Sequence, residues 1–313
     1  MLVQINCEKD DGGELAKEFN IKAYPTFVIA NAKGETIYRW WGYTKEMLFS
    51  ELARGLSDPT TIEQKETRYK KSPDATTART LAFYHQTNGN AEDALSFYLD
   101  AAKYDPDDDY ADDIYQIYSR GYRRGVYDIK DLQEWADKAL ASTHTDIDSK
   151  TYIYVGMARH IASNPADSRL LGYVKDGYQF VNENADKASA RIKNELMISY
   201  VLYVEKNIER AVGLKKEGMD EGWMDNAGDL NGFSWWCFEN KVNLEEAETL
   251  ALRGVNLAAA GREKAMILDT AAEIMNLRGK PEDAVKTIEL AIKEDPNSDS
   301  YKKQLERFRK AAN

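Results

Sequence analysis

The sequence predicts a mostly α-helical protein, in which a small α/β unit at the N-terminus precedes an α-helical solenoid of about six helix pairs. Three observations predict this fold class. Up to about residue 57, short runs of alternating apolar and polar residues are typical of strands. From about residue 73, apolar residues recur at helical spacing instead. The 313 residues include only seven prolines and are 30% charged, a composition that favours long solvated helices.

The change of periodicity divides the chain into three expected parts. They are an α/β unit over residues 1–57, a linker over 58–72 and a helical repeat domain over 73–313. A chain of this length is expected to hold about two domains. Beyond residue 72 we expect about twelve helices in antiparallel pairs, and no strand.

The first part should contain three strands and two helices. We expect the strands at residues 2–7, 27–30 and 36–41, and the helices at 14–19 and 45–56. The loop between the second and third strands carries Gly34 late, as hairpin loops prefer. Gly42 then ends the last strand before the second helix begins.

Two segments of the helical part follow the same order of residue types, over residues 76–106 and 268–296. Each has small residues on a first helix, a glycine at the turn, alanines on a second helix and a proline after it. Small residues let paired helices approach, and proline ends the second helix. These offsets resemble those of tetratricopeptide repeats, whose period is about 34 residues. Asn90 is expected to cap its helix, and Pro281 suits a first helical turn.

Less regular repeats fill the segment between these two. One second-helix residue anchors each unit: Ala94, Leu132, Leu171, Ala211, Ala247 and Ala284. The steps between anchors are slightly longer than the ideal unit, and they predict about six helix pairs.

Residues 1–56 resemble the C-terminal half of a thioredoxin domain. The matching pieces are the strand that ends at Cys7, the segment of residues 14–35 and Gly42 before the last helix. The resemblance implies that the Tyr24–Pro25 bond is cis. It also implies that the Tyr24-Pro25-Thr26 loop offers main-chain groups to an extended peptide.

The half of that domain that carries Cys-x-x-Cys has no counterpart in the sequence. The two cysteines, Cys7 and Cys237, are far apart, and dithiol exchange needs a neighbouring resolving thiol. We interpret Cys7 as a small apolar strand residue. The chain as given is therefore not expected to be an oxidoreductase.

Composition excludes several other classes of function. The net charge of −11 and the pI of about 5.0 argue against nucleic acid or anionic membranes as partners. No run of 18 apolar residues exists, so no membrane span is predicted. Two cysteines and three scattered histidines indicate no metal and no cofactor.

Catalytic motifs are absent from the sequence as well. It has no phosphate-binding loop, no His-Glu-x-x-His and no nucleophile elbow, so we predict no catalytic residue. The acidic stretch of residues 105–109 imitates a calcium loop but lacks its glycine and its distal glutamate. We interpret this stretch as a solvated loop and helix cap.

Aromatic residues admit two interpretations, a binding groove or packing between repeats. Four tyrosines stand on predicted first helices: Tyr115, Tyr118, Tyr152 and Tyr154. Packing between repeats is the favoured interpretation. In the Trp235-Trp236 pair, and likewise in Trp40-Trp41, one ring should face the core and its neighbour should face elsewhere.

Three functions remain open. The first is a non-catalytic, monomeric scaffold that binds a polypeptide through the concave face of the repeats, with Tyr24-Pro25-Thr26 as a second contact. The second is the C-terminal fragment of a thiol-disulfide oxidoreductase active in cell redox homeostasis. Exported bacterial proteins that join a thioredoxin domain to helical repeats are similar to the chain in this respect. The third is an enzyme that uses the helical groove.

The first two functions differ in what precedes Met1. In the second, the Cys-x-x-Cys segment and an export signal lie upstream of Met1. Met1 runs directly into a strand pattern without a secretory signal. The expected location is cytoplasmic by default, and extracytoplasmic or periplasmic if a leader is missing.

Overall fold

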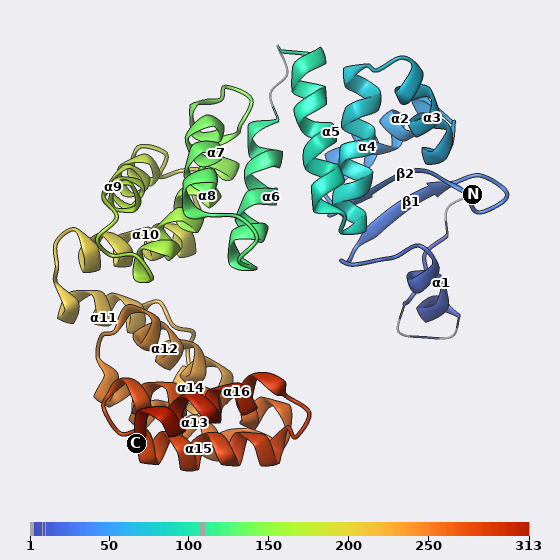
Figure 1. Cartoon of the computed structure of the whole chain (residues 1–313). Coiled ribbons are helices and arrows are strands. Elements are labelled where there is room, and N and C mark those ends of the chain that lie inside the picture. The colour runs from blue at the N-terminus through green and yellow to red at the C-terminus, as the bar shows by residue number, and fades with distance from the viewer. Residues whose placement is uncertain (1–2, 8, 10, 107–109, 313) are drawn as a thin grey trace. The chain divides into compact units, whose positions relative to one another are not determined.

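A computed structural model of the chain describes residues 3–7, 9, 11–106 and 110–312. The chain divides into two compact units, Met1–Asp146 and Ile147–Asn313 (Figure 1). The elements of the first unit are α1 (Gly12–Glu18), β1 (Thr26–Ala30), β2 (Thr36–Trp41), α2 (Lys45–Ser57), α3 (Ile62–Lys71), α4 (Ala75–Asn88), α5 (Ala91–Tyr104), α6 (Ala111–Arg123) and α7 (Ile129–Ala141).

The second unit is entirely helical in its described residues. Its elements are α8 (Ile147–Arg159), η1 (His160–Ala162), α9 (Ser168–Glu183), α10 (Ala190–Tyr203), α11 (Ile208–Glu217), η2 (Trp223–Asp225), α12 (Ala227–Asn240), α13 (Leu244–Leu257), α14 (Arg262–Leu277), α15 (Pro281–Glu294) and α16 (Asp299–Ala312). The protein is therefore mostly α-helical with one small sheet near the N-terminus, as the sequence predicts.

The sheet is an antiparallel hairpin of β1 and β2, in which Thr26 lies opposite Trp41. Gly34 in the connecting loop has a φ of +83°, a conformation that glycine adopts without steric cost. The ring of Trp40 is buried and stacks on Phe27, with centroids 4.8 Å apart. Because α2, α3 and α4 all pack against β2, the hairpin shares its core with the first helices.

The expected strand over residues 2–7 is wrong for the part that the structure describes, since residues 3–7 belong to no strand. Two turns follow instead: Lys9 N–H donates to the Asn6 carbonyl at 3.2 Å, and Gly12 N–H donates to the Lys9 carbonyl at 3.0 Å. A Cβ at Gly12 would lie 2.1 Å from the Asn6 carbonyl oxygen, so only glycine permits this close approach. These turns lead directly into α1, and the described sheet has two strands instead of three.

Residues 58–72, expected as a linker, contain α3. Thr61 and Gln64 form a capping box, in which each side chain accepts a hydrogen bond from the other residue's backbone N–H. Tyr69 of α3 is buried in a core that it shares with residues of α4, α5 and α6. The division between the compact units falls at Asp146–Ile147, beyond the first helix pairs.

The predicted six helix pairs are confirmed. Neighbouring helices pack as α4–α5, α6–α7, α8–α9, α10–α11, α12–α13 and α14–α15, and α16 follows the last pair. Five of the predicted anchors lie on the second helices and have no exposed surface: Ala94, Leu132, Ala211, Ala247 and Ala284. The anchor at Leu171 is wrong by one position, because Leu170 is the buried residue and Leu171 is half-buried. No strand lies among the described residues beyond residue 72.

The turns within the regular pairs combine confirmed and wrong predictions. Gly89 and Gly279, the expected turn glycines, have φ values of +88° and +76°. Pro281 occupies the first turn of α15, as expected. Asn90 is the residue before α5, but its side chain makes no capping hydrogen bond. The side-chain amide approaches His85 instead, at 3.5 Å from Nδ1.

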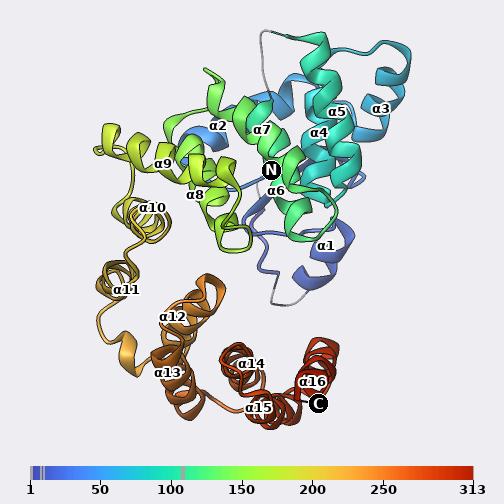
Figure 2. The same ribbon diagram turned by 60° about the vertical axis from the view of Figure 1, so that its left-hand side comes forward.

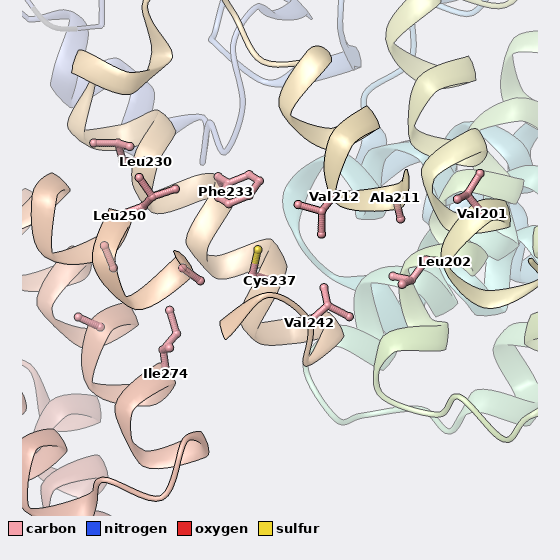
Figure 3. Close-up of a cluster of buried hydrophobic side chains, with 13 residues drawn as sticks. Val201, Leu202, Ala211, Val212, Leu230, Phe233, Cys237, Val242, Leu250 and Ile274 are labelled. Atoms are coloured by element: carbon pink, nitrogen blue, oxygen red, sulfur yellow. The ribbon is translucent and has the colours of Figure 1, made fainter. Parts of the chain in front are cut away.

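Helices α10 to α14 share one cluster of buried apolar residues. Figure 3 shows Phe233 and Cys237 of α12 lying between Val212 of α11 and Leu250 of α13. Within this unit the helices follow one another in a curved row, with α12 and α14 on its inner side and α13 and α15 on its outer side (Figure 2).

Candidate binding site

The Tyr24-Pro25-Thr26 loop, predicted as a peptide contact, immediately precedes β1. The Tyr24–Pro25 bond is cis, the isomer that the thioredoxin resemblance implies. The Pro25 carbonyl accepts a hydrogen bond from Gly42 N–H at 3.0 Å, and Thr26 Oγ1 donates to the Ala23 carbonyl at 2.6 Å. The loop is thus fixed against the end of β2, and its role as a contact stays a prediction.

Exposed apolar side chains lie beside this loop. Tyr24 is 70% exposed, and Tyr43 and Met47 are exposed as well. Tyr43 follows Gly42, whose N–H is hydrogen-bonded to the Pro25 carbonyl. The centroid of the Tyr43 ring lies 6.3 Å from that of the Phe27 ring. We call Tyr24, Tyr43 and Met47 the hairpin patch. An exposed apolar group of this kind offers a contact for another apolar surface.

Two adjoining cavities, of about 220 and about 240 Å³, lie between α2, α3, α4 and the start of α6. Both are lined by Tyr38, Arg54, Thr76 and Thr80, and we call them together the polar groove. Its position beside Tyr38 of β2 and its polar lining residues make it the first place to look for a ligand.

Two arginines of the polar groove pair with carboxylates beside them. Arg54 contacts Glu51 at 2.8 Å, and Tyr38 donates a hydrogen bond to the same carboxylate at 2.5 Å. Arg68 contacts Asp58 at 2.6 Å. Burial alone would raise the pKa of Asp58, but hydrogen bonds from Arg68 and Thr60 outweigh it and hold that pKa below its ordinary value. Arg54 and Arg68 are therefore each paired with a carboxylate of the same chain.

The buried amine of Lys65 is also fully engaged. Its Nζ donates to the carbonyls of Ile37 at 3.2 Å and Asp58 at 3.0 Å, and to that of Thr60. An ammonium has three donors, so all of them are used. Burial lowers the pKa of Lys65, and the nearby Asp58 carboxylate opposes that effect. Lys65 thereby joins β2 to the turn between α2 and α3.

Three of the four tyrosines predicted on first helices pack inside the array, as the favoured interpretation holds. Tyr115 is buried, Tyr118 lies 4.5 Å from Tyr127, and Tyr154 lies 5.4 Å from Phe180, as measured between ring centroids. The fourth, Tyr152 on α8, is 61% exposed.

Two further first helices carry exposed apolar side chains. Trp235 on α12 is 36% exposed, while Trp236 packs against the core, so the predicted split of this pair is confirmed. In the other pair, Trp40 is buried and Trp41 is half-buried. Met266 on α14 is 47% exposed, and sequence reasoning missed it. Its spacing from the buried Leu268 places it off the core face, which is the signal that could have identified it.

Other predicted chemistry can be placed only in part. Residues 107–109 of the acidic stretch lie outside the described residues, while Asp105 follows the end of α5. Among the described residues, no group of three or more His, Cys, Asp or Glu side chains is placed to hold a metal ion. None of the described helices has both the length and the apolar character that a membrane crossing requires.

Comparison with known proteins gives a weak likeness. No protein-family model matches the chain, and no curated protein matches it. Among solved structures, the chain is similar to a thermophilic TPR protein of Thermus thermophilus, with 15% identity and a TM-score of 0.30. The match covers 76% of this chain and 98% of that one. A TM-score this low leaves the fold to be argued from the helix pairs themselves.

Proposed function

We propose that this protein is a non-catalytic scaffold that binds another polypeptide through the first helices of its repeat array. The observation that carries the proposal is the exposure of Tyr152, Trp235 and Met266, each on the first helix of its pair. Curved repeat arrays use their inner side as an extended binding surface. Helices α12 and α14 lie on that side in the second unit (Figure 2).

Charge and the N-terminal hairpin add to this proposal. A net charge of −11 favours basic or neutral polypeptides and speeds their association at low salt. The order α1, β1, β2, α2 matches the order expected from the thioredoxin resemblance, apart from the first strand. We infer that the hairpin patch, with the Tyr24-Pro25-Thr26 loop, serves as a second polypeptide contact.

A salt-dependent pull-down with matched variants tests the proposal. The intact chain should enrich a polypeptide at about 50 mM salt and less of it at about 500 mM, where charge attraction is screened. Tyr152→Ser and Met266→Ser should reduce the enrichment. Leu252→Ser and Leu290→Ser remove exposed apolar side chains from the second helices α13 and α15. These two variants should enrich the polypeptide as well as the intact chain does.

Two outcomes would contradict the proposal. One is that no polypeptide is enriched at the lower salt concentration, in which case the array acts as a spacer. The other is that the second-helix variants lose the partner as completely as the first-helix variants, which would move the binding surface to the other side.

A further inference from the structure

The hairpin of β1 and β2 leaves a row of main-chain groups unpaired along the outer edge of β1. In an antiparallel pair, hydrogen-bonded and non-hydrogen-bonded residue pairs alternate along the strands. Gly42 N–H donates to the Pro25 carbonyl at 3.0 Å, so these two opposed residues form a hydrogen-bonded pair. In the same register, the main chain of Phe27 bonds to β2, whereas the N–H and C=O groups of Thr26 and Val28 point away from it.

No other segment of the described chain hydrogen-bonds to this edge through its main chain. Helices α2, α3 and α4 pack against β2, and Figure 1 shows β1 on the side of β2 away from α3 and α4. The sheet has two strands, and no main-chain group outside it bonds to the main chain of Thr26 or Val28 in the described residues. An unpaired edge of this kind is a template on which another strand can pair.

Aromatic rings lie on one face of the hairpin beside this edge. Phe27 stacks on Trp40 with centroids 4.8 Å apart, and the Tyr43 ring lies 6.3 Å from Phe27 at an interplanar angle of 28°. Trp40 is buried, whereas Tyr43 is 60% exposed, so the row of rings runs from the core to the surface. A strand added to β1 places every second side chain on the face that carries Phe27.

We propose that β1 accepts an extended segment of the partner polypeptide, which pairs with the main chain of Thr26 and Val28 as a third strand of the sheet. The segment is neutral or basic, and its apolar side chains at alternate positions pack on Phe27 and on Tyr43 of the hairpin patch. This inference rests on the proposed polypeptide contact at the hairpin, and it names the way in which the partner is held there.

Charge favours a partner of this kind over a second copy of the chain. Each copy carries a net charge of −11, so two copies repel each other, whereas a basic segment is attracted. In strand addition, main-chain hydrogen bonds provide affinity and pockets for alternate side chains provide specificity. Because β1 is five residues long, a peptide of about seven residues spans it.

The probe is a synthetic peptide of about seven residues in which lysine and valine alternate. Fluorescence anisotropy should detect its binding to the full chain at about 150 mM salt. Val28→Pro removes an outward N–H but no bond to β2, and it should weaken binding about tenfold. Val28→Thr keeps the N–H and a β-branched side chain and should bind like the wild type. The same peptide N-methylated at every residue keeps its charge but cannot donate, so it should not bind.

Two further measurements do not depend on the proline variant. Tyr43→Ser should also weaken binding, whereas Leu56→Ser, which removes a similarly exposed side chain from the C-terminal end of α2, should not. In the wild type, saturation with the peptide should slow hydrogen exchange of the Val28 amide about tenfold, because that N–H becomes hydrogen-bonded.

The inference is overturned if the peptide binds Val28→Pro and the wild type equally, or if it leaves the exchange of Val28 unchanged. It is also overturned if sedimentation shows a wild-type dimer that Val28→Pro abolishes, because a second copy then occupies the edge. Its failure is distinguishable from failure of the proposed function. If Tyr152→Ser loses the polypeptide enriched in the pull-down and Val28→Pro retains it, the scaffold stands and strand addition is wrong.

Discussion

Arg39 shows how one side chain ties separate parts of the first unit together. It lies on β2 and is 3% exposed. Its guanidinium donates to the Phe19 carbonyl at 2.8 Å, the Asn88 side chain at 3.1 Å and the Thr87 carbonyl at 3.3 Å. These acceptors lie at the C-terminal ends of α1 and α4, where a positive charge is favourable. Arg39 thereby fixes both helix ends to the hairpin.

Replacing Arg39 should destabilise the protein strongly. Arg39→Met removes the guanidinium donor from the Phe19 and Thr87 carbonyls, and we expect the free energy of unfolding to fall by about 2–4 kcal/mol. Lys138→Met removes an exposed i,i+4 pair with Glu134 and should cost less than about 1 kcal/mol. Urea unfolding of both variants measures the difference. Equal losses would show that Arg39 does not tie the helices to the hairpin.

The two cysteines should differ in reactivity. Cys237 is fully buried, and burial, followed by the nearby Glu246 carboxylate, raises the pKa of its thiol to about 12. Since the thiolate is the reactive form, a thiol reagent at about pH 8 should label only Cys7 in the folded chain. Cys7→Ser should then abolish labelling until the protein is unfolded. Rapid native labelling of Cys237 would contradict the buried thiol.

Because neither cysteine has a neighbouring thiol, the purified chain should not reduce insulin disulfides above background. A turbidity assay against a thioredoxin control measures this activity. Turnover that disappears in the Cys7→Ser variant would show that the chain is an oxidoreductase after all.

At the scale of elements, α9 offers a matched pair of glycines. A Cβ at Gly177 would lie 2.8 Å from Tyr154 Cβ, whereas a Cβ at Gly172 would meet nothing within 4 Å. Gly177→Ala should therefore lower the free energy of unfolding by about 1–3 kcal/mol through overpacking. Gly172→Ala should raise it by up to about 1 kcal/mol, because alanine favours the helix. Thermal and urea unfolding measure the change in the free energy of unfolding of each variant. A change of the same sign in the two variants would refute the close contact between α8 and α9.

Elements whose residues carry a local signal could be predicted from the sequence. The hairpin has a glycine in its loop, and the helix pairs have their own periodicity and turn glycines such as Gly89 and Gly279. The strand expected at residues 2–7 failed because a strand forms only if a distant partner pairs with it. The anchor at Leu171 failed because two adjacent leucines fit the same pattern.

The candidate surfaces were less predictable than the fold. Trp235 could be predicted to point away from the core, because adjacent helical residues face different directions. The polar groove and the contact between α14 and α16 join residues that are far apart in the sequence. Glu273 and Gln304 look like ordinary polar residues of amphipathic helices until α14 and α16 are packed together.

At the scale of the whole molecule, the second unit carries its own hydrophobic cores. One cluster surrounds Phe233 and another surrounds Phe308. We therefore expect residues 147–313, expressed alone, to be helical by circular dichroism and to unfold cooperatively.

A fragment of residues 163–313 is the matched control. It lacks α8, against which α9 packs, and should lose stability because the apolar face of α9 is uncovered. If residues 147–313 show no cooperative transition, the second unit does not fold independently.

Packing of helix pairs against the next pair in sequence, as in the second unit, has a consequence for how such a chain changes length. The α12–α13 pair contacts α14 of the next pair, and Ala247 and Ala284 are buried at corresponding places on the second helices of the two pairs. A duplication of one such segment would insert a module whose two faces already match those on either side. The protein can therefore gain or lose reach by whole repeats, a route that a fold closed around a single core does not have.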